Sequence, residues 1–155
     1  MNDSAHERAA WERHPNITGP ASTLLAIHDQ FRAASRRIAV LINRELPDIG
    51  WVRRAYQPLA ITLHHHHHAE EEMLFPMMLE RTGTAPEQLV RDHQVLTDAI
   101  AAVEGALSEA DVIRARGTIT SFDEILVEHL AREEALVIPV LLEMTAGEAW
   151  ALLHG

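Results

Sequence analysis

The chain lacks cysteine altogether and has few aromatic residues, and both absences narrow what it can be. Without thiols it has no disulfide bonds, no thiolate zinc site and no cysteine nucleophile. Aromatic residues make up only 5% of a chain that is 47% hydrophobic, which favours helices packed through Leu, Ile, Val and Ala over a β-sandwich. A length of 155 residues suffices for one domain with a substantial core. We therefore expect a single domain, residues 1–155.

Basic charge and long apolar runs are also scarce. Lysine is absent, so all 13 basic residues are arginine, and the formal net charge is −10. An acidic chain is a poor partner for nucleic acid. The longest uncharged apolar run is far shorter than a membrane span, and the charged N-terminus does not resemble a signal peptide. We therefore expect no nucleic-acid partner, no membrane partner and a cytoplasmic location.

Helical periodicity, in contrast, is abundant. Apolar residues recur at alternating steps of four and three along four segments, at about residues 22–45, 51–81, 84–107 and 111–144. Short connections between long helices imply antiparallel neighbours around one core. The predicted fold is all-α, an up-down antiparallel four-helix bundle with its core at about residues 22–144.

Cap residues mark several of the expected helix ends. Ser22 is a candidate N-cap for the first long helix, and Thr84 for the third. Short extra helices are expected at both termini. One spans about residues 3–13, and the other begins at Thr145, which forms a capping box with Glu148. These signals place the helices without yet indicating a function.

Each long segment carries one histidine on its apolar seam, namely His28, His66, His93 and His129. In the second and fourth segments a glutamate follows one turn later. The predicted seam of the second segment comprises Leu59, Leu63, His66, Glu70, Met73 and Met77. The predicted seam of the fourth comprises Phe122, Leu126, His129, Glu133, Leu136 and Val140.

An internal repeat fixes which histidines matter. After His66, Glu-Glu follows at the fourth and fifth positions and Pro at the tenth, and the same pattern follows His129. Five consecutive histidines, residues 64–68, allow other pairings, of which His67 with Glu71 is the nearest competitor. The proline and the seam both select His66 with Glu70. The remaining histidines of the run are expected to point elsewhere, as solvated residues or as supports of the site.

Six inward-facing polar side chains predict a metal site. A histidine and a glutamate four residues apart lie on one helix face, so both can reach the bundle axis. Buried carboxylates without a partner are costly, and no seam offers an arginine. Two cations would remove this cost, with two glutamates bridging them and two histidines completing each. Mixed imidazole and carboxylate ligation suits Fe, with Mn or Zn as substitutes. The candidate ligands are His28, His66, Glu70, His93, His129 and Glu133, with Glu71 and Glu134 at the flanks.

This pattern, with Leu-Phe-Pro after the first Glu pair, resembles the hemerythrin-like, HHE cation-binding domain family over roughly residues 22–143. The resemblance implies a non-heme di-iron centre with an oxo or hydroxo bridge. By that resemblance the four histidines are terminal ligands, and Glu70 and Glu133 are bridges. Two positions depart from the oxygen-carrying hemerythrins. Leu89 replaces an additional His, and Glu133 and Glu134 stand where those proteins have an Asp five residues after the His.

The resemblance and the site together predict a protein that binds or turns over O2, NO or H2O2, in a stress response. The missing His leaves a coordination position for such a ligand, and the helices offer no evident pocket for a large substrate. Two alternatives remain, a non-enzymatic sensor of O2, iron or redox state and an iron-handling protein. Both would act through a protein partner.

Overall fold

The computed structural model describes residues 3–154, and no β-strand occurs within that range, so the all-α prediction is confirmed. Residues 1–2 and 155 of the predicted domain lie outside the described part. The helices in chain order are α1 (Asp3–Glu12), α2 (Pro20–Ile42), α3 (Ile49–Ala69), η1 (Glu70–Leu74), α4 (Phe75–Thr82), α5 (Glu87–Ser108), α6 (Val112–Leu142) and α7 (Ala146–His154).

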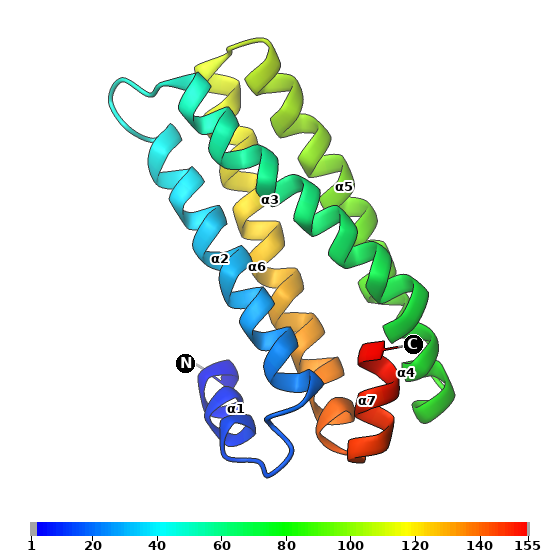
Figure 1. The fold of residues 1–155 in the computed structure, drawn as a ribbon. Helices are drawn as coiled ribbons and strands as arrows, with labels where there is room; N and C mark the ends of the chain where they lie inside the picture. Colours follow the sequence, from blue (N-terminus) through cyan, green and yellow to red (C-terminus); the bar gives the residue numbers. More distant parts are fainter. Residues whose placement is uncertain (1–2, 155) are drawn as a thin grey trace.

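Four long helical segments lie side by side (Figure 1). Helix α2 packs against α3 and α6, and α5 packs against α6 and α3. Successive segments run in opposite directions, with α3, η1 and α4 forming one continuous descent (Figure 1). This arrangement fits the predicted bundle. The short helices α1 and α7 lie at the end where α2 begins.

Two of the predicted N-caps are wrong. Helix α2 begins at Pro20, whose fixed φ suits the first turn, and Ser22 lies inside the helix with its hydroxyl donating to the Gly19 carbonyl at 3.0 Å. Helix α5 begins at Glu87, beyond Thr84. In both places the chain enters the helix through a proline or just after one, so a side-chain cap is not the signal that sets the boundary.

The predicted capping box before α7 is confirmed. The backbone N–H of Thr145 donates to the Glu148 carboxylate at 2.7 Å, and the backbone N–H of Glu148 donates to the Thr145 hydroxyl at 3.3 Å. These two bonds satisfy N–H groups that the first turn of a helix leaves without partners.

A single π-helical turn, η1, interrupts the second long segment. Its backbone N–H groups donate to carbonyls five residues back, so the turn holds one extra residue. The side chains that follow are therefore rotated about the helix axis relative to a regular α-helix. The prediction that Met73 continues the seam is therefore wrong. Met73 is 47% exposed, and Leu74 and Met78 are buried instead. Met77 is partly buried and packs against the apolar interior, as the seam predicted.

Helix α6 shows a similar change without a π-turn. Leu136 was predicted on the seam but is 46% exposed, and Val137 and Leu141 are buried in its place. An α-helix has 3.6 residues per turn, so a buried stripe on a long straight helix drifts away from a strict four-three alternation.

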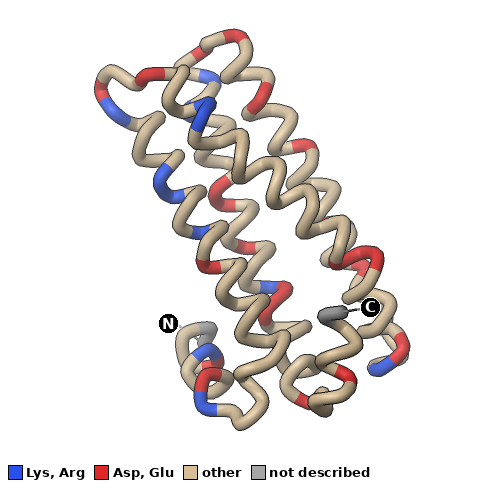
Figure 2. The backbone as a smooth tube through the Cα atoms, in the orientation of Figure 1, with Lys and Arg blue, Asp and Glu red and all other residues tan. Residues whose placement is uncertain are grey.

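Charged residues are spread along the length of the molecule rather than gathered at one end (Figure 2). Within the part of the chain that the structure describes, no helix is both long enough and apolar enough to cross a membrane. The buried apolar residues form two separate clusters in the interior.

Candidate metal centre

A layer of histidines and glutamates separates the two apolar clusters. Along α2, Leu24 belongs to one cluster and Phe31 to the other, and His28 lies between them. Along α5, Leu89 and Leu96 flank His93 in the same way. The seam periodicity thus brings polar side chains from all four long segments to one level of an otherwise apolar interior.

All six predicted ligands meet in this layer. Two groups of side chains each have candidate ligand atoms within 4.8 Å of one another, His28, His66, Glu70 and Glu133 in one, and His67, Glu70, His93 and His129 in the other. Glu70 belongs to both groups. The structure therefore offers two adjacent places for a cation, with one carboxylate shared between them.

The two glutamates lie between the histidines. Oε1 of Glu70 is 2.6 Å from Nε2 of His66, and its Oε2 is 3.3 Å from Nε2 of His93. Oε2 of Glu133 is 3.3 Å from Nε2 of His129 and 3.7 Å from Nε2 of His28. Each carboxylate therefore faces histidines from both halves of the chain.

Buried polar atoms in this layer lack hydrogen bonds of good geometry. Among the described residues, seven buried side-chain N and O atoms have none, and all seven belong to this layer. They are both carboxylate oxygens of Glu70 and Glu133 and the Nε2 atoms of His67, His93 and His129. Leaving one such group unsatisfied costs about 1–3 kcal/mol, so this donor set fits bound cations better than an empty protein interior.

Three of the histidines are held from behind by carboxylates. Nδ1 of His28 lies 3.0 Å from Oε1 of Glu134, and Nδ1 of His93 lies 2.7 Å from Oε1 of Glu71. Nδ1 of His129 lies 3.4 Å from Asp92. A carboxylate that accepts a hydrogen bond from Nδ1–H fixes the tautomer in which Nε2 carries a free lone pair, which is the form that binds metals.

The flanking glutamates occupy the places expected of them. Glu134 also pairs with Arg32 at 2.8 Å, so its charge is balanced outside the layer. Asp92 likewise pairs with Arg132 and accepts from Gln88 at 2.8 Å. Sequence reasoning missed Asp92, because its place beside His129 depends on how α5 and α6 pack.

The two inner glutamates have opposite pKa shifts. Burial raises the pKa of Glu133, and the facing charge of Glu70 raises it further. Burial also acts to raise the pKa of Glu70, but the adjoining His66 and His93 rings outweigh it and leave the pKa well below its ordinary range. The protein alone therefore favours one charged glutamate at this level, and a cation would allow both to ionise.

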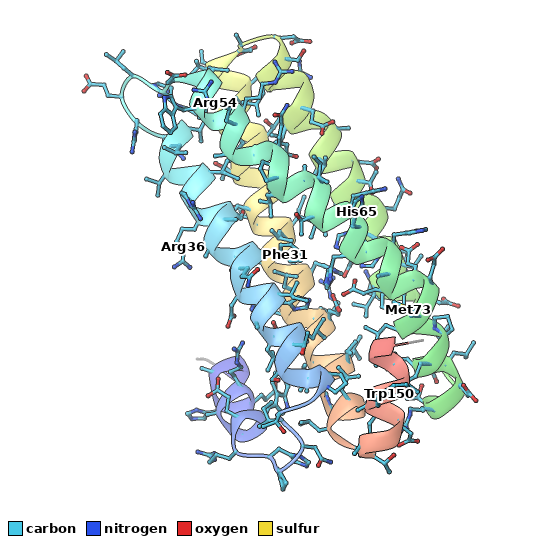
Figure 3. All side chains as sticks on the ribbon, viewed as in Figure 1. Phe31, Arg36, Arg54, His65, Met73 and Trp150 are labelled. Carbon is cyan, nitrogen blue, oxygen red and sulfur yellow. The ribbon has the colours of Figure 1, made fainter. Side chains whose placement is uncertain are left out.

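His67 is the residue that sequence reasoning misplaced. The seam predicted that its side chain points away from the core, yet it is 7% exposed and its ring stacks on His93 with centroids 3.8 Å apart. Burial, followed by the nearby His93, lowers the pKa of His67 to about 2, so the ring stays neutral. Of the other histidines in the run, His64, His65 and His68 are exposed as predicted (His65 is labelled in Figure 3).

The only tyrosine lies outside the layer. The Tyr56 hydroxyl donates to the carbonyl of Ile100 at 3.3 Å, and its ring packs edge-on against Phe122. Helix α3 continues through Pro58 without a break, so Tyr56 stays away from the histidines.

Two openings lead to the layer, and the larger one corrects the expectation that the helices offer no evident pocket for a large substrate. A groove of about 810 Å³ lies between α3 and α5 and reaches His67 and His93. A smaller pocket of about 170 Å³, lined mostly by apolar residues such as Leu24 and Ile27, reaches His66 and Glu70. The first opening is large enough for a small organic molecule, and the second only for a few atoms.

Comparison with known proteins gives one match. The family model described as the hemerythrin HHE cation-binding domain matches residues 37–141, about two thirds of the chain. This segment contains every residue of the two groups except His28, which the geometry alone places with the others. No curated protein and no solved structure matches. The chain belongs to the hemerythrin HHE cation-binding domain family.

Proposed function

We propose that this chain forms an up-down antiparallel four-helix bundle that holds two iron ions and binds or turns over a small oxidant, O2, NO or H2O2. The observation that carries the proposal is the set of seven buried N and O atoms that lack well-directed hydrogen bonds and converge on one level. Membership of a cation-binding family supports the same reading.

In this proposal each group of side chains holds one ion. His28 and His66 would bind one, and His93 and His129 the other, with Glu70 and Glu133 between them. The shared membership of Glu70 and its two differently directed oxygens support a bridging role. Glu133 is preferred over Glu134 as the second bridge, because both of its oxygens face inward and Glu134 is bound to His28 and Arg32.

Mixed imidazole and carboxylate ligation suits iron, with Mn or Zn as weaker candidates. Bound iron would supply the one-electron chemistry that O2, NO and peroxide require, and no side chain of this layer does so. The residues themselves orient the ligand nitrogens, through Glu71, Glu134 and Asp92, and exclude bulk water through the apolar clusters on either side.

The small apolar pocket supports a small uncharged ligand. It ends at His66 and Glu70, and Leu152 of α7 contributes to its wall. A diatomic molecule or peroxide fits such a space, whereas a charged metabolite would lose its hydration there without a compensating partner. We assign no side chain as a general acid or base.

The groove between α3 and α5 favours a second candidate function, iron handling through a partner. It reaches the layer at His67 and His93, and exposed His64 and His68 line it. An exposed path with nitrogen donors would allow iron to move between this protein and an acceptor. Loss of iron from the loaded protein to an apo-acceptor, without any oxidant, would distinguish this function.

Turnover tests the leading proposal. Iron-loaded protein should convert two H2O2 to two H2O and one O2, or should bind NO with a change in its visible spectrum, at a rate that depends on iron content. The matched control is Glu70→Ala loaded in the same way, which lacks the shared carboxylate. Iron-loaded wild-type protein that neither consumes peroxide nor responds to NO or O2 would reject the oxidant function and leave iron handling.

A further inference from the structure

His67 differs from its neighbours in the five-histidine run. Its side chain is 7% exposed, whereas His64, His65 and His68 are exposed. The groove between α3 and α5 reaches His67. The side chain is therefore buried although open space lies beside it. Its Nε2 atom is buried without a hydrogen bond. Because such burial is costly, we look for a group that this nitrogen would bind.

The geometry of the His67 ring matches that of the ligand histidines. It stacks on His93 at 13° between ring planes and meets His129 edge-on, with centroids 5.3 Å apart. Its Nε2 atom is buried and has no hydrogen-bond partner, like those of His93 and His129. One ring nitrogen of each of these three histidines and one oxygen of Glu70 lie within 4.8 Å of one another.

Two consecutive histidines reach the layer because Glu70 lies one turn beyond both. His66 precedes Glu70 by four residues and His67 by three, and both spacings bring side chains together on a helix surface. Successive residues on a helix differ in direction by about 100°. The two rings therefore lie on different sides of the carboxylate, His66 beside His28 and His67 beside His93.

Packing alone does not account for this arrangement. A residue needed only to stack on His93 would serve as well if it were apolar, and Phe75 already stacks on the same ring at 5.4 Å. Burying an imidazole nitrogen without a partner is costly, so an apolar side chain would be the more stable choice for packing.

We propose that His67 is a fifth histidine ligand, so that the two ions have different surroundings. One ion would be bound by His67, His93 and His129, and the other by His28 and His66, with the carboxylates between them. This inference rests on the proposed di-iron function. It replaces the near-symmetrical centre expected from the sequence with one that has three histidines on the side of the groove.

The substitution His67→Phe tests the inference, because phenylalanine can keep the ring stack but has no nitrogen that could bind a metal. His65→Phe is the matched control, since it adds the same ring at an exposed position of the same run. Each protein would be titrated anaerobically with Fe(II), and the loaded samples compared by Mössbauer spectroscopy. Wild type and His65→Phe should give two doublets of equal area. His67→Phe should bind one iron at least about 10-fold more weakly and lose or shift one doublet.

Two unchanged doublets and unchanged affinities in His67→Phe would overturn the inference and leave His67 as a packing residue. Circular dichroism checks that the variant is helical, and His67→Leu, which is smaller and has no donor atom, decides the question in the same way if the phenylalanine does not fit. Failure of the wild-type protein itself to bind two irons would refute the proposed function as well, which separates the two outcomes.

Discussion

Nδ1 of His28 lies 3.0 Å from Oε1 of Glu134. This contact links α2 to α6 through the residue that directly follows the inner Glu133. The other half of the chain repeats this relationship, because Glu71 follows the inner Glu70 and holds Nδ1 of His93. In each Glu-Glu pair, the first residue faces the layer and the second fixes a histidine of a neighbouring helix. The repeat in the sequence thus encodes two kinds of carboxylate.

This division of roles predicts graded effects on metal binding. Glu134→Ala and Glu71→Ala should each weaken iron affinity about 10–100-fold, because the histidine that each carboxylate orients becomes free to turn. Isothermal titration with Fe(II) under anaerobic conditions measures the change. Glu72→Ala is the control, since Glu72 is exposed and contacts only His68 among the ion pairs of the described chain. An equal loss in Glu72→Ala would contradict the orienting role.

The inner glutamates should affect the metal-free protein in opposite directions. The pKa of Glu133 is raised in the folded protein above its unfolded value near 4.5. Its contribution to the free energy of unfolding is therefore fully present below pH 4.5 and is lost as the pH rises through the folded pKa. Glu133→Gln should therefore raise the melting temperature of the metal-free protein near neutral pH. Glu70 has a lowered pKa, so its charge stabilises the fold above that value, and Glu70→Gln should lower the melting temperature.

Thermal unfolding after treatment with a chelator measures both changes. The difference between Glu133→Gln and wild type should shrink as the pH is lowered toward the unfolded pKa, because wild-type Glu133 then becomes protonated as well. A Glu133→Gln protein that melts below wild type at neutral pH would show that the charge of Glu133 is stabilising without metal, against this account.

Within the histidine run, position 66 should matter and position 65 should not. His66→Ala should lose iron and, with it, the stabilisation that binding provides, about 3 kcal/mol when free iron exceeds its Kd a hundredfold. His65 is exposed, so His65→Ala should leave iron content and melting temperature unchanged. Elemental analysis and thermal unfolding of the two variants decide this. Equal iron content in both would mean that the assigned register is wrong.

The small apolar pocket should carry diatomic ligands to the centre. Ala69 lines it, so Ala69→Phe should fill part of its 170 Å³ and slow NO binding while leaving iron content unchanged. Ala101→Phe, on an exposed face of α5, is the control. Stopped-flow mixing with NO gives the rates. If Ala60→Phe, in the wall of the larger groove, slows binding and Ala69→Phe does not, ligands enter through the groove instead.

The sequence predicted much of this centre because helical periodicity is a local property. In the first long helix, residues at alternating steps of four and three are all buried, namely Leu24, His28, Phe31, Ser35, Ile38 and Ile42. The same periodicity brought one histidine from each long segment to a single level. Where residues face is set by spacing alone as long as the helix is regular.

The features that escaped prediction depend on contacts between helices. The π-turn η1 moved Met73 out of the core. The local sequence does not predict this turn, because α6 has the same Glu-Glu pair and a proline at the corresponding position but remains α-helical. His67 was misplaced for a related reason, since adjacent residues rarely both face one core. The groove arises from the separation of α3 and α5, which a periodic pattern does not report.

Iron content per chain is the most direct test of the central claim. Protein without a purification tag would be reconstituted anaerobically with Fe(II), freed of loosely bound metal, and measured by elemental analysis together with its near-ultraviolet and visible spectrum. The account predicts about two irons per chain and, after exposure to air, the charge-transfer bands of an oxo-bridged iron pair. Less than one iron per chain, or zinc alone without those bands, would contradict it.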